Sequence, residues 1–197
     1  MSFALGLTGN IGMGKSTTAR LFAEAGCAVW DADAAVHRLY EAGGAAVLPI
    51  RALFPQATEA GFVDRSILKS LISKDKSVLT AIVNIVHPLV HADRNAFRQA
   101  VTEKILVFDI PLLFETGAAD EMDAVACVYV DAEVQRARVL DRGTMSEEQF
   151  EQILAKQMPI AQKLAQSDYR IETDTLEHAR RQVTTVLEDI ERRMQHA

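Results

Sequence analysis

A glycine-rich segment near the start of the chain constrains the fold more than any other feature. Residues 9–16 read GNIGMGKS and match the pattern G-x-x-x-x-G-K-[ST] at every fixed position. An apolar run over Phe3–Leu7 precedes the segment, and a helical pattern over Lys15–Ala25 follows it. Backbone N–H groups surround a phosphate in such a loop, so glycine is needed where a side chain would block the approach. The sequence therefore predicts a strand, a phosphate-binding loop and a helix in that order.

The side chains of this loop have separate predicted roles. Lys15 is placed to reach the β- and γ-phosphates of ATP, and Ser16 is placed to ligate Mg²⁺. Thr17 is predicted to contact an inner phosphate. The positive N-terminal end of the following helix supports the same phosphates. The other loop residues predicted to bind ATP are Asn10, Ile11, Gly12, Met13 and Gly14.

Further short apolar runs predict an α/β fold. Each run is short enough for a buried strand, and helical patterns lie between them. Strands that alternate with helices are typical of a parallel sheet covered on both faces. We therefore predict a P-loop core with a five-stranded parallel sheet flanked by helices. The later strands are predicted over Ala28–Trp30, Ile105–Phe108, Val125–Val130 and Tyr169–Ile171, and later helices over Ala132–Asp141 and Leu176–Met194.

The interval 34–104 is much longer than a single crossover helix requires. Its pattern is mostly helical, and its longest helical stretch covers Val78–Ala100. Pro88 is expected to kink or break that stretch, because proline removes a hydrogen bond inside a helix. We predict a helical insertion large enough to hold an acceptor substrate.

A charged segment over residues 142–159 is predicted to form a lid. Gly143 lies near its start, and Ser146 and Gln149 have the spacing of a capping box, which starts a helix. Arg138 and Arg142 stand at its entrance. Mobile lids close over the phosphates in many kinases. The alternative is an ordinary helical hairpin on the surface.

Three aspartates follow predicted strands, and ligands bind at the carboxyl ends of strands in open α/β sheets. Asp31 and Asp33 follow the second strand, and Asp109 ends the third. Phosphoryl transfer to an alcohol needs a carboxylate that orients the hydroxyl and accepts its proton. Asp33 fits that role or the role of a helix N-cap, and the pattern alone does not choose. Asp109 is predicted to ligate the metal, the alternative being a turn residue before Pro111.

Missing motifs narrow the class of nucleotide-binding protein. No lysine is followed two positions later by aspartate, so the guanine-specific [NT]-K-x-D motif is absent. The D-x-x-G switch motif and the Ser-Gly-Gly-Gln transporter signature are absent as well. A small-molecule kinase is therefore the main prediction. A nucleotide-dependent switch or binding module remains the alternative from another class.

Composition restricts the compartment and the partners. The net charge of −6 argues against a general nucleic-acid binder, which would carry a basic excess. Cys27 and Cys127 lie far apart in apolar stretches and are expected to be buried thiols, which suits a reducing cytoplasm. The first residues do not resemble a signal peptide, and no apolar run reaches the length of about 18 residues that a membrane span needs.

These residues together resemble the dephospho-coenzyme A (dephospho-CoA) kinase family, and the resemblance runs in order along nearly the whole chain. The matching elements are LTGNIGMGKST at residues 7–17, Asp31-Ala32-Asp33, Gly61 with Asp64-Arg65 and Leu68, His87-Pro88, PLLFE at residues 111–115, Gln135 with Arg138 and Arg142, and Gln157.

The resemblance implies a fold, a reaction and a set of site residues. It implies a nucleotide-binding core over residues 1–33, 105–140 and 168–197, an acceptor (CoA) insertion over 34–104 and a lid over 141–160. It also implies transfer from ATP to the ribose 3′-hydroxyl of dephospho-CoA, with Asp33 as the base, Lys15 and Arg142 as further catalytic residues, and Arg138 with Arg142 beside ATP. The acceptor would contact Thr8, Asp33, Arg65, His87, Pro111, Leu112 and Glu115.

The chain departs from the family pattern in one loop. The family's Asn and Gly after the last strand correspond here to Thr173 and Thr175, so the resemblance does not indicate how the adenine is held. Another P-loop kinase, of the nucleotide or shikimate type, is the alternative within the same class. The sequence does not indicate the oligomeric state.

Overall fold

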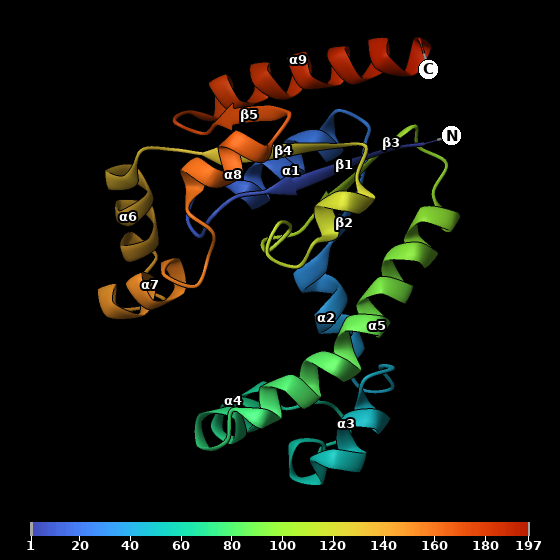
Figure 1. The fold of residues 1–197 in the computed structure, drawn as a ribbon, viewed down its shortest axis with the longest axis vertical. Helices are drawn as coiled ribbons and strands as arrows, with labels where there is room; N and C mark the ends of the chain where they lie inside the picture. Colours follow the sequence, from blue (N-terminus) through green and yellow to red (C-terminus); the bar gives the residue numbers. More distant parts are fainter. Residues whose placement is uncertain (1, 197) are drawn as a thin grey trace. The chain divides into compact units, whose positions relative to one another are not determined.

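The computed structural model describes residues 2–196 and divides into two compact units (Figure 1). One unit runs up to Trp30 and resumes at Thr102, and it is called the core unit below. The other covers Asp31–Val101 and is called the helical unit. The insertion predicted over 34–104 therefore begins and ends three residues earlier in the structure, and Asp33 belongs to the helical unit instead of the nucleotide-binding core.

A five-stranded sheet forms the centre of the core unit in the order β2-β3-β1-β4-β5. The pairs β1–β3, β1–β4 and β4–β5 are parallel, and Leu7 of β1 lies opposite Asp109 of β3. This register brings the ends of β1 and β3 to the same edge of the sheet. The strands are β1 Phe3–Thr8, β2 Ala28–Asp31, β3 Ile105–Asp109, β4 Ala124–Tyr129 and β5 Tyr169–Glu172.

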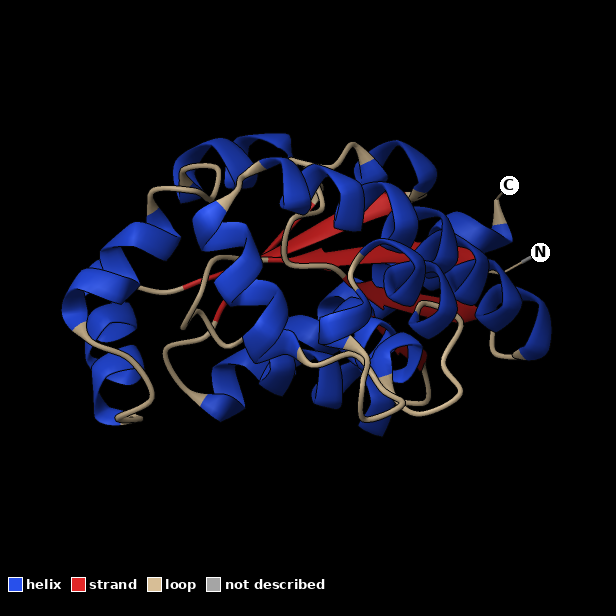
Figure 2. Ribbon diagram, turned by 90° about the horizontal axis from the view of Figure 1, so that it is seen from below, coloured by secondary structure: helices blue, strands red, loops and turns tan. Residues whose placement is uncertain are grey.

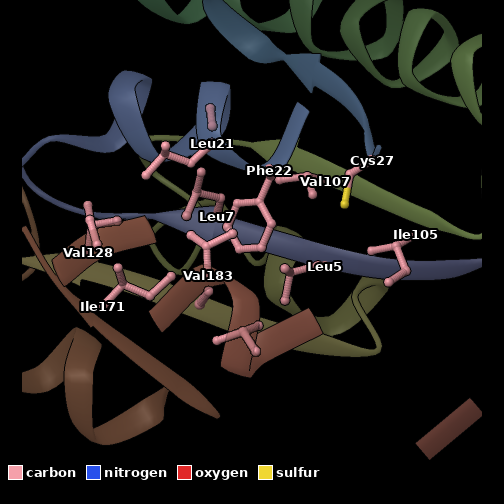
Figure 3. Close-up of a cluster of buried hydrophobic side chains, with 14 of the residues drawn as sticks. Leu5, Leu7, Leu21, Phe22, Cys27, Ile105, Val107, Val128, Ile171 and Val183 are labelled. Atoms are coloured by element: carbon pink, nitrogen blue, oxygen red, sulfur yellow. The ribbon is translucent and has the colours of Figure 1, made fainter. Parts of the chain in front are cut away.

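Apolar side chains on both faces explain why these strands are central. Residues 4–8 of β1 and all of β3 are buried, as expected for a parallel sheet with helices on each side (Figure 2). On one face, α1 (Lys15–Glu24) and α9 (Leu176–Gln195) pack against the strands and against each other. Figure 3 shows Phe22 of α1 between Leu5 and Leu7 of β1 and Val183 of α9. Burial of this apolar surface is the main stabilising contribution to the core unit.

The remaining helices of the core unit follow β3 and β4. Among them, α8 contacts β4, and α7 starts with the predicted capping box, in which Ser146 and Gln149 each bond the other's backbone N–H. These elements are η2 Ala118–Glu121, α6 Ala132–Asp141, α7 Glu147–Leu154 and α8 Ile160–Gln166.

The helical unit has its own apolar cluster, which includes Leu39, Ile50, Leu68 and Ile82. Its helices α2 and α5 are in contact, and an ion pair of 2.7 Å joins Arg38 to Asp93. The elements are α2 Ala32–Tyr40, α3 Val47–Leu53, η1 Pro55–Ala57, α4 Arg65–Lys74 and α5 Ser77–Ala100.

Several sequence predictions can be compared directly with these elements. The five strands and the helices after β1, after β4 and at the end of the chain lie where they were predicted, and each of their ends agrees within one residue. Pro88 was expected to kink or break the long helix, and it does not break it, because α5 continues through the proline. Both cysteines are buried, as predicted. No helix within residues 2–196 is long and apolar enough to cross a bilayer.

Candidate functional site

The loop between β1 and α1 has the backbone of a phosphate-binding turn. The N–H of Met13 donates to the carbonyl of Asn10 at 3.1 Å, which closes the turn. Gly12 and Gly14 have φ values of 77° and 85°, a left-handed conformation that glycine adopts at little cost. A Cβ on Gly12 would lie 2.4 Å from a methyl group of Val139 in α6. Both glycines therefore meet a conformational need, and Gly12 also allows α6 to approach closely.

Lys15 and Asp109 meet beside this loop. The Lys15 ammonium pairs with the Asp109 carboxylate, whose side chain is only 1% exposed. The N–H of Ile110 donates to the carbonyl of Leu7 at 3.0 Å, so the chain after β3 is held against the end of β1. Ser16 lies in the exposed first turn of α1. The structure thus brings together the predicted phosphate lysine and the strand-end carboxylate.

Two glutamines hold the first half of the loop from opposite sides. Gln135 of α6 donates through Nε2 to the carbonyl of Ile11 at 2.7 Å. Gln157, in the turn before α8, accepts the N–H of Ile11 at 3.0 Å. The next residue, Met158, accepts a hydrogen bond of 3.2 Å from the Asn10 side chain. Both glutamines belong to the family pattern, but their role as supports of the P-loop is visible only in the structure.

Thr173, at the position of the family's Asn, also supports the loop. Its buried hydroxyl donates to the carbonyl of Met13 at 2.9 Å. A Cβ on Gly14 would lie 2.9 Å from that hydroxyl oxygen. Arg138, predicted to bind ATP, donates to the Thr173 hydroxyl at 3.1 Å and to its carbonyl at 2.6 Å. Arg138 therefore fixes the loop after β5, while Thr175, at the position of the family's Gly, caps α9.

A second loop, over residues 111–115, follows Asp109. The fully buried Thr8 hydroxyl donates to the carbonyl of Pro111 at 3.1 Å. Lys163 of α8 is also fully buried; it donates to the same carbonyl at 3.0 Å and pairs with Glu115 at 2.9 Å. Burial alone would raise the pKa of Glu115, but the Met158 N–H and the Lys163 ammonium more than offset it, so that pKa is lowered. No sequence pattern marks Lys163, because a lone lysine in a short helix is normally exposed.

The predicted lid lies between α6 and α8. Arg142 is the C-cap residue of α6 and its side chain is exposed. An ion pair between Arg136 and Glu147 joins α6 to the first turn of α7. The capped helix α7 and the turn before α8 make up most of the range predicted for the lid.

The other predicted site residues belong to the helical unit. Asp33 is exposed in the first turn of α2, and it is not the N-cap of that helix. The cap is Asp31, which accepts the N–H of Ala34 at 2.9 Å. Arg65 starts α4 and lies over the Tyr40 ring at 5.4 Å, on a cavity of about 410 Å³. His87 is exposed on α5.

Comparison with known proteins assigns this site to a family. The family model for dephospho-CoA kinase matches residues 3–178. A dephospho-CoA kinase from Ruegeria pomeroyi is 61% identical over 190 residues, which is 96% of each chain. The chain belongs to the dephospho-CoA kinase family. It is therefore a kinase, and its family uses ATP as the phosphoryl donor.

Solved structures agree with this family. A dephospho-CoA kinase from Campylobacter jejuni superposes with a TM-score of 0.72 at 25% identity, over 96% of this chain and 98% of that chain. A shikimate kinase from Bacteroides thetaiotaomicron superposes with a TM-score of 0.52 at 16% identity, over 96% of this chain and 98% of that chain, and this likeness shows the fold alone. The predicted P-loop kinase fold and the predicted family are confirmed.

Proposed function

We propose that the chain transfers the γ-phosphoryl group of ATP to the ribose 3′-hydroxyl of dephospho-CoA and so makes CoA. The meeting of Lys15, Asp109 and the P-loop in a chain of this family is the observation that carries the proposal. A P-loop supplies positioning and charge for phosphoryl transfer and needs little covalent chemistry of its own. The family match favours this activity over a shikimate or nucleotide kinase and over a nucleotide-dependent switch.

The donor would lie on the loop from Asn10 to Thr17. The backbone N–H groups after Met13 and the N-terminal end of α1 would surround the phosphates. Lys15 would move from Asp109 to the β- and γ-phosphates and stabilise the charge on the group in transfer. Arg142, exposed at the entrance of the lid, would approach the same phosphates when the lid closes, with Arg138 holding the loop beside ATP.

Mg²⁺ is proposed to bind between Ser16 and Asp109. A hydroxyl and a carboxylate are the hard oxygen ligands that this ion prefers, and it usually adds substrate phosphates and water to one or two protein ligands. The register that sets Asp109 opposite Leu7 brings its carboxylate to the P-loop edge of the sheet, so the residues present fit the ion. When bound, Mg²⁺ would supply positive charge to the transferring group.

The residues proposed to contact the acceptor are taken one unit at a time. Asp33 would orient the 3′-hydroxyl and accept its proton, a role that its exposed position and its lack of a capping bond leave open. Arg65 would meet an anionic or aromatic part of the acceptor at the cavity beside Tyr40. His87 of the helical unit, and Pro111, Leu112 and Glu115 of the core unit, are the other residues proposed to contact the acceptor. Because Thr8 is fully buried, we propose that it holds the Pro111 carbonyl through its hydroxyl instead of contacting the acceptor itself.

The proposed site of action is the cytoplasm, where ATP and the CoA precursors of bacteria are present. The acidic net charge of −6 and the buried thiols are compatible with that compartment.

The proposal is tested by measuring ADP release with Mg²⁺ and ATP against dephospho-CoA, adenosine, AMP and shikimate. We expect turnover with dephospho-CoA alone and its near-complete loss in Asp33→Asn, since removal of a general base costs about 10²–10⁴-fold. Asp31→Asn is the matched control: asparagine caps a helix about as well as aspartate, so this variant should keep most of the turnover. Turnover with a different acceptor, or an unaffected Asp33→Asn enzyme, would contradict the substrate or the base respectively.

A further inference from the structure

Lys163 has a position that the proposed reaction does not use. Its side chain is fully buried, which is rare for lysine. Its ammonium donates to the Pro111 carbonyl at 3.0 Å and pairs with the Glu115 carboxylate at 2.9 Å. A buried ammonium is stable only with such partners, so these contacts constrain the residues that supply them.

The two partners of Lys163 also bind other segments of the core unit. The Pro111 carbonyl accepts the hydroxyl of Thr8 at the end of β1, at 3.1 Å. The Glu115 carboxylate accepts the backbone N–H of Met158 at 2.8 Å. One ion pair therefore joins the end of β1, the loop 111–115 and the turn at residues 157–158.

The turn at residues 157–158 in turn contacts the P-loop. Gln157 accepts the N–H of Ile11 at 3.0 Å, and Met158 accepts a hydrogen bond from Asn10 at 3.2 Å. A continuous chain of charge-assisted and neutral hydrogen bonds thus runs from Glu115 to the first half of the loop that would hold ATP.

The loop 111–115 is held so that one leucine is buried and its neighbour is exposed. Leu113 packs on the sheet over Gly6, where a Cβ would lie 2.8 Å from a Leu113 methyl group. Leu112 is 41% exposed. If this loop only had to be stable, apolar residues in place of Lys163 and Glu115 would serve equally well, because buried ion pairs add little net stability. A charged hydrogen bond has a preferred direction, so the Lys163 ammonium fixes the orientation of the Pro111 carbonyl.

We propose that Lys163 is a positioning residue that, together with Glu115, locks the loop 111–115 and the turn 157–158 onto the end of β1. The lock holds the loop proposed to line the acceptor in one geometry relative to the P-loop. The expected effect of this lock on acceptor binding rests on the proposed function.

The experiment compares wild type, Lys163→Met, Glu115→Gln and the double variant, with Lys104→Met as the control. Lys104 is an exposed lysine of the same unit, so its variant removes the same charge without touching the lock. The double variant removes both charges, so it remains interpretable if Glu115→Gln leaves the fully buried Lys163 ammonium without its carboxylate and folds poorly. The readouts are kcat, the KM for dephospho-CoA, the affinity for a non-hydrolysable ATP analogue and amide hydrogen exchange.

We expect the KM for dephospho-CoA to rise about tenfold in Lys163→Met and in the double variant, in line with the loss of one charged hydrogen bond. The affinity for the ATP analogue should change less than about twofold, because the P-loop keeps Gln135 and Thr173. Amides of residues 112–117 and 157–158 should exchange about tenfold faster than in the Lys104→Met control.

A lowered melting temperature with unchanged KM and unchanged exchange in these two segments would overturn the inference, since the pair would then serve stability alone. The exchange and ATP-analogue measurements do not need the acceptor. If wild type failed to phosphorylate dephospho-CoA, the proposed function would fail, while the exchange data would still support or overturn the lock.

Discussion

At the scale of single residues, the P-loop owes its shape to side chains outside its own motif. Thr173 donates to the carbonyl of Met13, and Arg138 holds Thr173 in place. Thr173 also lies where a side chain on Gly14 would project. At this position, threonine therefore acts on the conformation of the phosphate loop, whatever it contributes to binding of the adenine.

Gly14→Ala should abolish most ATP binding. Alanine at this position must adopt a φ of 85°, which strains its backbone, and its Cβ lies 2.9 Å from the Thr173 hydroxyl oxygen. The matched control is Gly26→Ala, because Gly26 has a φ of 92° with nothing within 4 Å of its Cβ position. Both variants should lose about 1–2 kcal/mol of unfolding free energy from backbone strain, measured by denaturant titration.

Only Gly14→Ala should weaken the affinity for an ATP analogue, by at least about tenfold, measured by calorimetry. Equal affinities in the two variants would show that Thr173 yields to the added methyl group at no cost to the loop.

At the scale of elements, the long helix α5 shows how tertiary packing overrides a local signal. Pro88 lacks the N–H that would bond the carbonyl of Asn84 four residues earlier. The helix nevertheless runs from Ser77 to Ala100, and its residues Ile82, Ile85 and Leu89 join the apolar cluster of the helical unit. Burial along the helix on both sides of the proline offsets the one missing hydrogen bond.

Pro88→Ala should raise the free energy of unfolding by about 1–3 kcal/mol, because alanine supplies the missing N–H and relieves the ring contact with the preceding turn. Pro55→Ala is the matched control, since Pro55 opens η1, where no N–H is required. That variant should be neutral or slightly less stable. Urea unfolding of both proteins checks the expectation, and equal stability of the two would contradict it.

At the scale of the whole molecule, two buried thiols make the core unit sensitive to high pH. Burial, with a smaller contribution from Glu191, raises the pKa of Cys27 from 9.0 to about 11. Burial also raises the pKa of Cys127 in β4 to about 11, and it outweighs the opposing effect of Lys163. Between the ordinary thiol pKa of about 9 and the raised pKa of about 11, the unfolded chain releases thiol protons that the folded chain retains. Stability therefore falls as pH rises from about 9 to about 11.

Cys127→Ala should therefore show a shallower loss of stability over that range than wild type. One thiol whose pKa is raised from about 9 to about 11 accounts for about 2 kcal/mol of lost stability at the top of the range. The free energy of unfolding, measured in denaturant at several pH values for both proteins, gives the difference in slope. Parallel curves would mean that the Cys127 thiolate is tolerated in the folded state.

The sequence by itself determined the P-loop, the alternation of strands and helices, the long helical interval and the family. These features depend on local patterns, since glycine spacing, apolar runs and helix caps act within a few residues of each other. It left Asp33 undecided between base and cap, and the structure gives the cap to Asp31.

Only the tertiary structure decided which side chains support the P-loop and the loop 111–115. Lys163 and Thr173 contact residues far away in the chain, and their roles depend on burial and on partners that the fold brings together. Neither burial nor a long-range partner leaves a periodic signal near a single lysine or threonine. The chemistry of the site was therefore readable from the motif, while the side chains that position it became visible only in the folded core unit.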